Sequence, residues 1–413
     1  MTEPTAMLDA AIGHRHSIVA PPAEIAPSPA DLPGIHNWSV AYSPEDPWRT
    51  AGGGVGWTRD QARNAAIAEA LERYAAVTYP LPVHHPSSGI PVRSLADFTL
   101  FSHEQMARDD FPHRGALGPD AALTDVYRLA SNERTLAPAA LVGLTDQFGA
   151  LPTSSGLAAA PTASQALLRA TQEVIERDAF ISVWLHGLAP PRVALDLLLV
   201  DPVEQRAGWV AAYDITPQYS PHAVAMVVGN LPLHGRPRLS VGLACRASWA
   251  QAADKAYLEW SQGVIFAGHR SEREPALRFN TASDVLSFDD HATYYTIHPD
   301  RWQELPFMIS SAAVRTSPPS TTEGADLASL VTSLEAAGNE LFYRDLTMPD
   351  LLQIGLRVVR VLAPKLTPIH AHHAWPHLGG TTSNVGWRYD WLDQPGARPL
   401  GDVFPSPFPH PLG

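Results

Sequence analysis

Paired glutamates are the residues of this sequence best suited to do chemistry. Glu69 and Glu72 lie three positions apart, and so do Glu173 and Glu176, which on a helix puts both members of a pair on one face. Carboxylate oxygens suit Mg²⁺, which proteins usually bind together with phosphate groups. If the pairs converge, cations or arginines must neutralise the like charges. Residue chemistry therefore favours a magnesium and phosphate site over the simpler alternative, a solvated helix face with local ion pairs.

An internal repeat supplies the elements that would position these acids. Each copy contains a glycine, a Ser or Thr six residues later, a glutamine three residues after that, and a glutamate eleven residues after the Ser or Thr. The copies span residues 52–75, 156–179 and 242–263. The Ser/Thr-x-x-Gln spacing is typical of a capping box, in which the two side chains bond the free N–H groups of a helix start. We therefore expect one helix to begin in each copy.

The predicted helix starts follow Thr58, Thr162 and Ser248. The third helix keeps one acid, Glu259, and has Gln262 at the position of the second acid. Two apolar runs that are typical of strands, "AVAMVVG" and "RLSVGLA", precede the third helix. We therefore expect units of two strands and one helix, and three such units predict a pseudo-symmetric α/β fold.

The charge and composition of the chain exclude several classes of function. The net charge is −13, which argues against duplex nucleic acid as a partner. Of the 29 basic residues only Lys255 and Lys365 are lysines, and neither follows a glycine, so the chain has no P-loop. A nucleotide would have to be bound in another way.

The start of the chain, "MTEPTAMLDA", lacks the basic and apolar segments of a secretory signal, and no apolar run is long enough for a membrane helix. We therefore expect a cytoplasmic protein without a membrane partner. Cys245 is the only cysteine, which excludes an internal disulfide and a cysteine-rich zinc site.

Other candidate groups are weaker. The stretch "HAHHAWPH" contains His370, His372, His373 and His377, but without an HExxH pattern we favour a polar loop with packing histidines over a zinc site. We interpret Cys245 as a small buried residue rather than a nucleophile. The run "GGGVG" is similar to a phosphate-binding loop, and we interpret it as a turn before a helix.

Proline divides the chain into three expected parts. Its 39 copies are densest at residues 21–48 and at the C-terminal end. We expect an N-terminal arm over 1–45, a catalytic domain over 46–404 and a tail over 405–413. The tail sequence "PSPFPHPLG" cannot form a helix or an inner strand, so we expect a stiff polyproline II rod.

Several motifs, taken in order, resemble signatures of the YcaO superfamily over about residues 46–413. They are "T-x-x-QA…EALERY", "TSSGLAAAPT…QEVIERDAF", "ACRASWAQAADKAYLEWSQ" and "FYRDLTMPDLLQIGLRVVRVLAPKLTPI". The resemblance implies an α/β fold that binds ATP and Mg²⁺ between glutamate-bearing helices. It implies a metal-ligand set of Glu69, Glu72, Glu173 and Glu176. It implies a nucleotide-contacting set of Gln165, Arg177, Glu259 and Gln262.

Four positions depart from the pattern of the superfamily. Val55 stands where a lysine is common, Ser155 where an asparagine is common, Gln165 where an acid is common and Val264 where an arginine is common. Val55, Ser155 and Val264 are the basis of one alternative, a YcaO-like scaffold subunit that has lost catalysis.

The proline tail is similar to the ending of YcaO proteins that form azolines. The resemblance implies ATP-dependent cyclodehydration of Cys, Ser or Thr residues in a ribosomally made precursor peptide, with the Gly413 carboxylate as the base. A thioamide-forming YcaO enzyme is the second alternative, although such an enzyme would not need the tail.

The resemblance also implies partners. They are the precursor peptide, a ubiquitin-activating-enzyme-like or ThiF-like protein that binds its leader, and a flavin-dependent azoline dehydrogenase. Since no leader-binding module is visible in the sequence, we expect this chain alone to bind a leader peptide weakly. We also expect it to work as a homodimer or hetero-oligomer.

Overall fold

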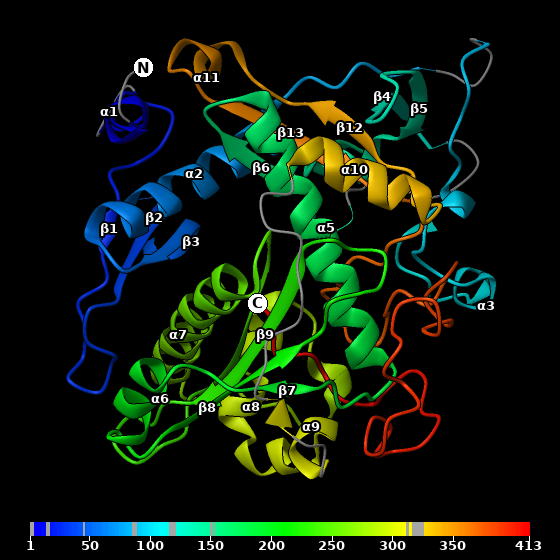
Figure 1. The fold of residues 1–413 in the computed structure, drawn as a ribbon. Coiled ribbons are helices and arrows are strands. Elements are labelled where there is room, and N and C mark those ends of the chain that lie inside the picture. The colour runs from blue at the N-terminus through cyan, green and yellow to red at the C-terminus, as the bar shows by residue number, and fades with distance from the viewer. Residues whose placement is uncertain are drawn as a thin grey trace.

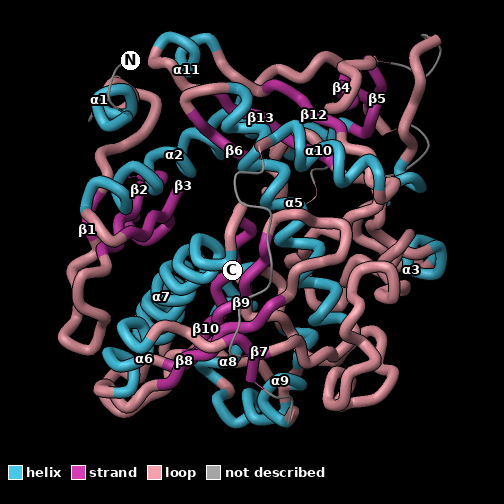
Figure 2. The backbone as a smooth tube through the Cα atoms, viewed as in Figure 1, coloured by secondary structure: helices cyan, strands magenta, loops and turns pink. Residues whose placement is uncertain are grey.

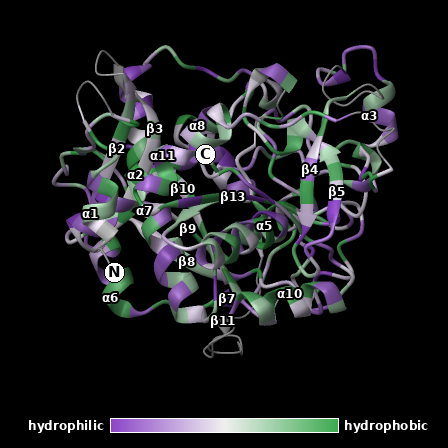
Figure 3. Cartoon of the chain, turned by 90° about the horizontal axis from the view of Figure 1, so that it is seen from above, coloured by the Kyte–Doolittle hydropathy of each residue, from purple (hydrophilic) through white to green (hydrophobic). Residues whose placement is uncertain are grey.

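The protein has a mixed α/β fold, as the repeat predicted. The computed structural model describes residues 4–13, 17–43, 46–84, 89–114, 121–148, 151, 153–310, 314–315 and 326–413. Three β-sheets are surrounded and separated by helices (Figure 1). Helix α5 (Ala163–Leu185) runs through the middle of the molecule in two perpendicular views (Figures 1 and 3). None of the described helices is both long enough and apolar enough to cross a bilayer.

The strands form sheets of three, five and five members. The first sheet has the order β1-β2-β3, with strands Ala23–Glu24, His36–Ser43 and Asp46–Gly56. The second has the order β10-β9-β8-β7-β11, with strands Leu239–Arg246, Ala223–Asn230, Trp209–Asp214, Arg192–Val193 and Val314–Arg315. The third has the order β5-β4-β12-β13-β6, with strands Arg134–Pro138, Leu123–Arg128, Phe342–Asp345, Arg357–Leu362 and Leu157–Ala160. Neighbouring strands are antiparallel, except that β7 and β11 are parallel.

Two further long helices accompany α5: α2 (Arg59–Thr78) and α7 (Trp249–Arg273). The shorter helices are α1 (Pro4–Asp9), α3 (His103–Ala107), α6 (Leu197–Glu204), α8 (Phe288–Ile297), α9 (Pro306–Ile309), α10 (Leu327–Ala336) and α11 (Pro349–Gln353).

The three helix starts predicted from the repeat are confirmed. Thr58 caps α2, and both halves of its capping box with Gln61 are formed. The hydroxyls of Thr162 and Ser248 cap α5 and α7 by accepting the backbone N–H of the residue three positions on. These bonds satisfy N–H groups that have no partner within the helix.

The strands before the helices match the expected unit in two copies of the repeat. The β2–β3 hairpin precedes α2, and the β9–β10 hairpin precedes α7. The second copy differs, because β6 lies at a sheet edge and pairs with β13, which comes later in the chain. The preceding hairpin, β4–β5, occupies the other edge of the same sheet.

Glycines allow helices to lie directly on strands. A methyl group on Gly54 of β3 would overlap the backbone of α2 at Ala62, and one on Gly242 of β10 would overlap α7 at Ala256. The "GGGVG" run is therefore part of a strand covered by a helix, and the turn that we expected is not formed there. Only glycine lets the two backbones approach this closely.

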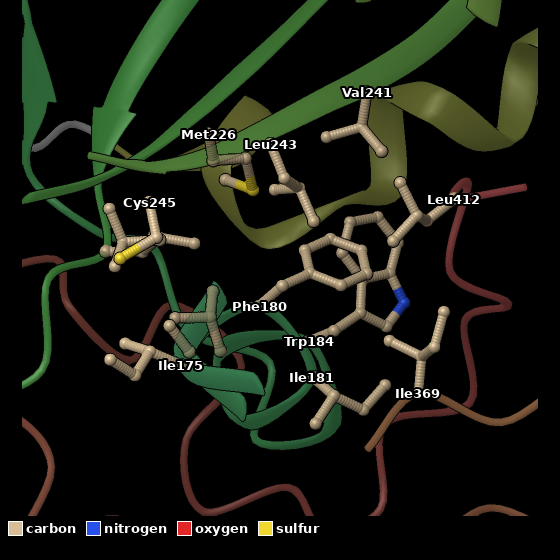
Figure 4. Packing of buried hydrophobic residues seen from close by; sticks show 14 of the residues in the cluster. Ile175, Phe180, Ile181, Trp184, Met226, Val241, Leu243, Cys245, Ile369 and Leu412 are labelled. Atoms are coloured by element: carbon tan, nitrogen blue, oxygen red, sulfur yellow. The ribbon is translucent and has the colours of Figure 1, made fainter. Parts of the chain in front are cut away.

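The apolar core is divided into three clusters. One lies between α5 and strands β8–β10, and Figure 4 shows Phe180 and Trp184 of α5 beside Leu243 of β10. A second packs α2 against the third sheet, and a third packs α7 against the second sheet. Strand β9 is buried along nearly its whole length, which explains its continuous apolar sequence.

The tail lies in the core as a bent chain. After β13 the chain continues without a helix or strand (Figure 2), and it bends at residues 404–405 and 407–408, so the straight rod that we expected is not formed. The indole of Trp184 donates to the Phe408 carbonyl at 2.7 Å and the Tyr295 hydroxyl to the Pro409 carbonyl at 2.8 Å. Proline has no N–H group, so a proline-rich segment forms few backbone hydrogen bonds of its own. Side chains of α5 and α8 fix the path of the tail by donating to its carbonyl groups.

The segment expected to be an N-terminal arm contains regular structure. Strand β2 falls within residues 1–45 and pairs with β3 beyond that boundary. The tail likewise contributes Leu412 to the main apolar cluster. The division of the chain at residues 45 and 404 remains a proposal about domain limits.

Candidate functional site

The glutamates of α2 point toward strands of two different sheets. Glu69 accepts the Gly53 N–H of β3 at 2.8 Å and pairs with the Arg73 guanidinium at 2.6 Å. Glu72 accepts the Ala159 N–H of β6 at 2.7 Å. The acid pair therefore bridges the first repeat to the second.

The glutamates of α5 repeat this arrangement one step further along the chain. Glu176 is buried and accepts the Cys245 N–H of β10 at 3.1 Å. Glu173 lies one turn earlier, and Arg177 faces both acids, with N···O distances of 3.5 Å to Glu173 and 3.8 Å to Glu176. This second pair bridges the second repeat to the third.

These bonds join equivalent positions of the repeat. Ala159 and Cys245 each lie three residues before a helix N-cap, and Glu72 and Glu176 each lie fourteen residues after one. The third helix continues the pattern with an amide, because Gln262 Nε2 lies 2.8 Å from the point where a Cβ on Gly53 would stand. Each long helix thus reaches a strand of another repeat.

The pKa shifts reveal how closely the carboxylates crowd. Burial and, after it, the nearby charge of Glu173 together raise the pKa of Glu72 to about 8. Burial together with the charge of Glu259 raises the pKa of Glu176 to about 7. Burial also raises the pKa of Glu173, against the lowering effect of Arg177. The five acids therefore form one acidic centre, which we define as Glu69, Glu72, Glu173, Glu176 and Glu259.

Two arginines, the buried Arg360 and the half-buried Arg177, lie beside the acidic centre with some N–H groups unpaired within the described part of the chain. Arg360 of β13 is 3% exposed, and its Nη2 donates to the Thr153 carbonyl at 3.0 Å. Its Nε and Nη1, and the same atoms of Arg177, are buried without a hydrogen-bond partner among the described residues. Burial lowers the pKa of Arg360 to about 10. Unpaired buried N–H groups are costly, so this arrangement suits an anion.

The two arginines line a pocket together with apolar residues. Thr153 and Ser155 contribute hydroxyls to it, and the remaining walls come from residues such as Leu100 and Leu362. Ser155 is one of the four positions at which the sequence departs from the pattern that it resembles. The pocket therefore combines a cationic end with an apolar surface.

Sequence reasoning missed several of the basic residues of this site. Arg169 precedes Glu173 by one helical turn and donates to the Ala159 carbonyl at 3.1 Å. Burial and the charge of Arg246 lower the pKa of Arg169, and the same charge partly opposes the rise in the pKa of Glu176. The four-residue spacing of Arg169 and Glu173 was a readable signal, but nothing in the "RVVRV" run marks Arg360 as buried beside an acid.

Gln165, Glu259 and Gly413 are exposed or half-buried. Gln165 is in the first turn of α5, with its side chain exposed, eight residues and about 12 Å along the helix from Glu173. Glu259 pairs with Lys255 at 3.1 Å. Gly413 is exposed and lies against Ala292 of α8. Burial raises the pKa of Asp289 in the first turn of α8, and Arg73 of α2 lies close enough for its charge to oppose that rise.

The weaker candidates divide into two groups. Cys245 is fully buried, and burial raises the pKa of its thiol far above the usual value, which agrees with an inert residue. His372 and His373 lie at the edge of their loop, whereas His370 and His377 are buried. His377 bonds the Pro368 carbonyl at 2.8 Å, as a packing histidine would.

The acidic centre and the arginines fit ATP and Mg²⁺. Carboxylates whose pKa values rise through mutual repulsion gain from a divalent cation, and arginines with free N–H groups gain from phosphate. Glu69, Glu72, Glu173 and Glu176 offer the oxygen ligands, and Arg177 and Arg360 offer the donors.

Comparison with known proteins identifies relatives of this chain. The model of the YcaO cyclodehydratases, described as ATP- and Mg²⁺-binding, matches residues 53–367. No curated protein sequence matches the chain.

Solved structures share the fold. A heterocyclase in complex with substrate and cofactor has a TM-score of 0.73 and 21% identity, covering 99% of this chain and 57% of its own. YcaO from Methanopyrus kandleri, bound with AMPPCP and Mg²⁺, has a TM-score of 0.63 and 18% identity, covering 88% of this chain and 91% of its own. The E. coli microcin synthetase McbBCD complex has a TM-score of 0.60 and 14% identity, covering 94% and 96%. The chain thus spans little more than half the length of the first heterocyclase.

Proposed function

The chain belongs to the YcaO family of ATP- and Mg²⁺-binding cyclodehydratases, and we propose that it is the ATP-using subunit of a complex that forms azolines in a ribosomally made peptide. The observation that carries the proposal is the acidic centre, in which acids of three helices face one another beside two arginines with unpaired N–H groups. A solvated helix face would have neither raised pKa values nor buried guanidinium groups.

The reaction that we propose removes one water from the peptide for each ring. The side chain of a Cys, Ser or Thr adds to the preceding amide carbon, and the amide oxygen then takes the terminal phosphoryl group of ATP. Phosphate leaves as the carbon–nitrogen double bond forms, so the products are the azoline, ADP and phosphate. Bound Mg²⁺ would neutralise the carboxylates and stabilise charge on the transferring phosphoryl group.

The protein's own residues would position these groups. The metal would be held by Glu69, Glu72, Glu173 and Glu176, whose helices are fixed by their capped starts and by the strands beneath them. Arg177 and Arg360 would donate to phosphoryl oxygens, since their unpaired N–H groups need an acceptor. Gln165, Glu259 and Gln262 would lie near the nucleotide, as the family resemblance implies.

A base must take the proton of the attacking or amide group, and we propose the carboxylate of Gly413 for this role. The support is positional: the tail is fixed through Trp184 and Tyr295, and Gly413 lies at the first turns of α8, which approach α2. A group held by such contacts loses little entropy when it accepts a proton.

We further propose that a leader-binding protein delivers the precursor peptide. Support comes from a structural neighbour, the McbBCD complex, which was also solved with its peptide pro-MccB17 bound. A flavin-dependent dehydrogenase that oxidises azolines is a further partner consistent with this chemistry.

Peptide-dependent ATP consumption tests the proposal. The chain should hydrolyse ATP when the precursor peptide and partner encoded beside it are present, and mass spectrometry should find the peptide lighter by one water per ring. No ATP consumption would favour a scaffold subunit, and a mass gain from sulfur in place of oxygen would favour a thioamide-forming enzyme. Either result would overturn the azoline assignment.

A further inference from the structure

Three histidines from distant parts of the sequence meet in the core beside the tail. His291 belongs to α8, His370 to the loop after β13, and His410 to the tail. Their exposed fractions are 0%, 4% and 1%. One ligand nitrogen from each lies within 4.8 Å of the other two. No residue of the acidic centre takes part in this group, which we call the histidine cluster.

Hydrogen bonds fix the protonation of two of the rings. His291 Nδ1 donates to the His410 carbonyl at 2.7 Å, and His410 Nε2 donates to the His370 carbonyl at 2.8 Å. A neutral imidazole carries one proton, so the other nitrogen of each ring holds a lone pair. Metal-bound histidines usually donate their second nitrogen to a carbonyl or carboxylate in this way.

One nitrogen of each ring has no hydrogen-bond partner in the part of the chain that the structure describes. Nε2 of His291, Nδ1 of His370 and Nδ1 of His410 are buried without a hydrogen bond among the described residues. A buried polar atom without a partner costs free energy, and three gathered at one point are unusual. The cluster therefore offers two nitrogen lone pairs, and a third from His370 in the tautomer that is protonated at Nε2.

The ring planes show which side chain must move before all three rings can bind one group. The His370 ring is nearly perpendicular to those of His291 and His410, at 86° and 81°. The His291 and His410 rings stack with centroids 3.7 Å apart and planes 5° apart. Because a coordinated metal lies near the plane of each imidazole, one stacked ring must turn about its side-chain bonds on binding, which leaves its backbone in place.

We propose that His291, His370 and His410 bind one Zn²⁺ ion. Three neutral imidazoles are a common ligand set of zinc sites that keep a fourth position for water, with Zn–N distances of about 2.0–2.1 Å. Hard cations such as Mg²⁺ prefer oxygen ligands and would remain at the acidic centre. The ion would supply the acceptor that the three nitrogens lack.

The position of His410 gives the ion a structural role. His410 lies three residues before Gly413, while His291 and His370 belong to the folded body. Zinc would therefore cross-link the tail to α8 and to the loop after β13, and it would do so in addition to the carbonyl bonds of Trp184 and Tyr295. The inference does not depend on the proposed reaction, since its readout is metal binding.

Equilibrium dialysis of the chelator-stripped chain against micromolar ZnCl₂ tests the proposal. Millimolar Mg²⁺ is included to occupy the acidic centre. We expect about one Zn²⁺ per chain, as for a single three-histidine site, and Co²⁺ in place of zinc should give the intense visible bands of a four-coordinate site. A wild-type chain that binds no Zn²⁺ overturns the proposal, whatever the variants do.

Three variants locate the ion. His370→Ala should lose the zinc, with folding checked by circular dichroism. His298→Ala is the matched control, because His298 ends α8 and also has a buried, unpartnered Nε2 but lies outside the cluster. Glu173→Gln should keep the zinc. Zinc lost from Glu173→Gln and kept by His370→Ala would place the ion at the acidic centre and contradict the proposal.

Discussion

The acidic centre and the histidine cluster solve the burial of ionisable groups in opposite ways. In the acidic centre, burial and the crowding of like charges raise the pKa of Glu72 to about 8. In the histidine cluster, burial keeps the rings neutral by lowering their pKa values, and the rings bond backbone carbonyls. Repulsion among the buried carboxylates destabilises the fold, and a bound cation would reduce that repulsion. The hydrogen bonds of the histidine cluster help to hold the tail in place.

This difference separates function from stability. Changing the acidic centre should remove activity without unfolding the protein, because the empty centre is already repulsive. Changing the tail should move the Gly413 carboxylate, and changing the helix–strand contacts should lower the stability of the fold. Four predictions follow this division, from the largest expected effect to the smallest.

Replacing Glu173 by Gln should abolish ATP turnover. The substitution keeps the size and helix propensity of the residue but removes a proposed metal ligand, so the loss should exceed the roughly 100-fold that an outer-shell change can cost. The melting temperature should stay equal or rise, because one repelling charge is gone. Glu272→Gln, an exposed acid in the last turns of α7, is the control. Unchanged hydrolysis with peptide and partner present would refute the metal-site assignment.

Deleting Leu412 and Gly413 should slow ring formation by about 100-fold or more, the scale of a lost general base. Mg-ATP binding should persist, because no member of the acidic centre is touched. Adding two glycines after Gly413 moves the carboxylate while leaving Leu412 in the core (Figure 4), so it separates chemistry from packing. Normal ring formation by both variants would exclude the carboxylate as the base.

Gly242→Ala should destabilise the fold without a direct effect on the acids. The added methyl group would overlap the backbone of α7 at Ala256 and Trp260, and overpacking of this kind costs about 1–3 kcal/mol. Thermal unfolding should show a melting temperature lower by several degrees. Gly386→Ala is the control, since its nearest neighbour, Asn384 Oδ1, would lie at 3.6 Å. Equal melting temperatures for both variants would contradict the packing argument.

The metal-free protein should lose stability as pH rises from about 5 to about 8. The unfolded Glu72 ionises near its ordinary pKa of 4.5, while the folded residue holds its proton up to about 8, so over this range the unfolded state releases protons first and is favoured. Melting temperatures measured in chelator should fall by a few degrees, and Glu72→Gln should fall less. Saturating Mg²⁺ and nucleotide should reduce the slope. A wild-type slope equal to that of Glu72→Gln would show that Glu72 is not perturbed.

Much of the fold and part of the site could be predicted from the sequence, because their residues lie within one repeating pattern. The capping residues Thr58, Thr162 and Ser248 fixed where each helix begins, and their common spacing to the acids indicated a shared face. The pairing of β6 with β13 could not be predicted, since it depends on which strand reaches the sheet edge after folding.

The histidine cluster and Arg360 were hidden for a similar reason. His291, His370 and His410 come from segments with no common spacing, and only the tertiary fold brings them together. Arg360 lies in the strand sequence "RVVRVL", and an arginine in a strand ordinarily faces solvent. Only the structure reveals that these residues are buried and that some of their polar atoms lack hydrogen-bond partners among the described residues.

The bonds from Glu72 to the Ala159 N–H and from Glu176 to the Cys245 N–H have a consequence for dividing the chain. Each acid depends on a backbone that lies in the next repeat, so a fragment holding a single repeat would carry carboxylates whose donors stay on another polypeptide. Two inactive fragments, split between the first and second repeats, should regain ATP binding when mixed, provided that α2 can dock against β6 again. The acidic centre therefore depends on contacts between successive repeats of the chain.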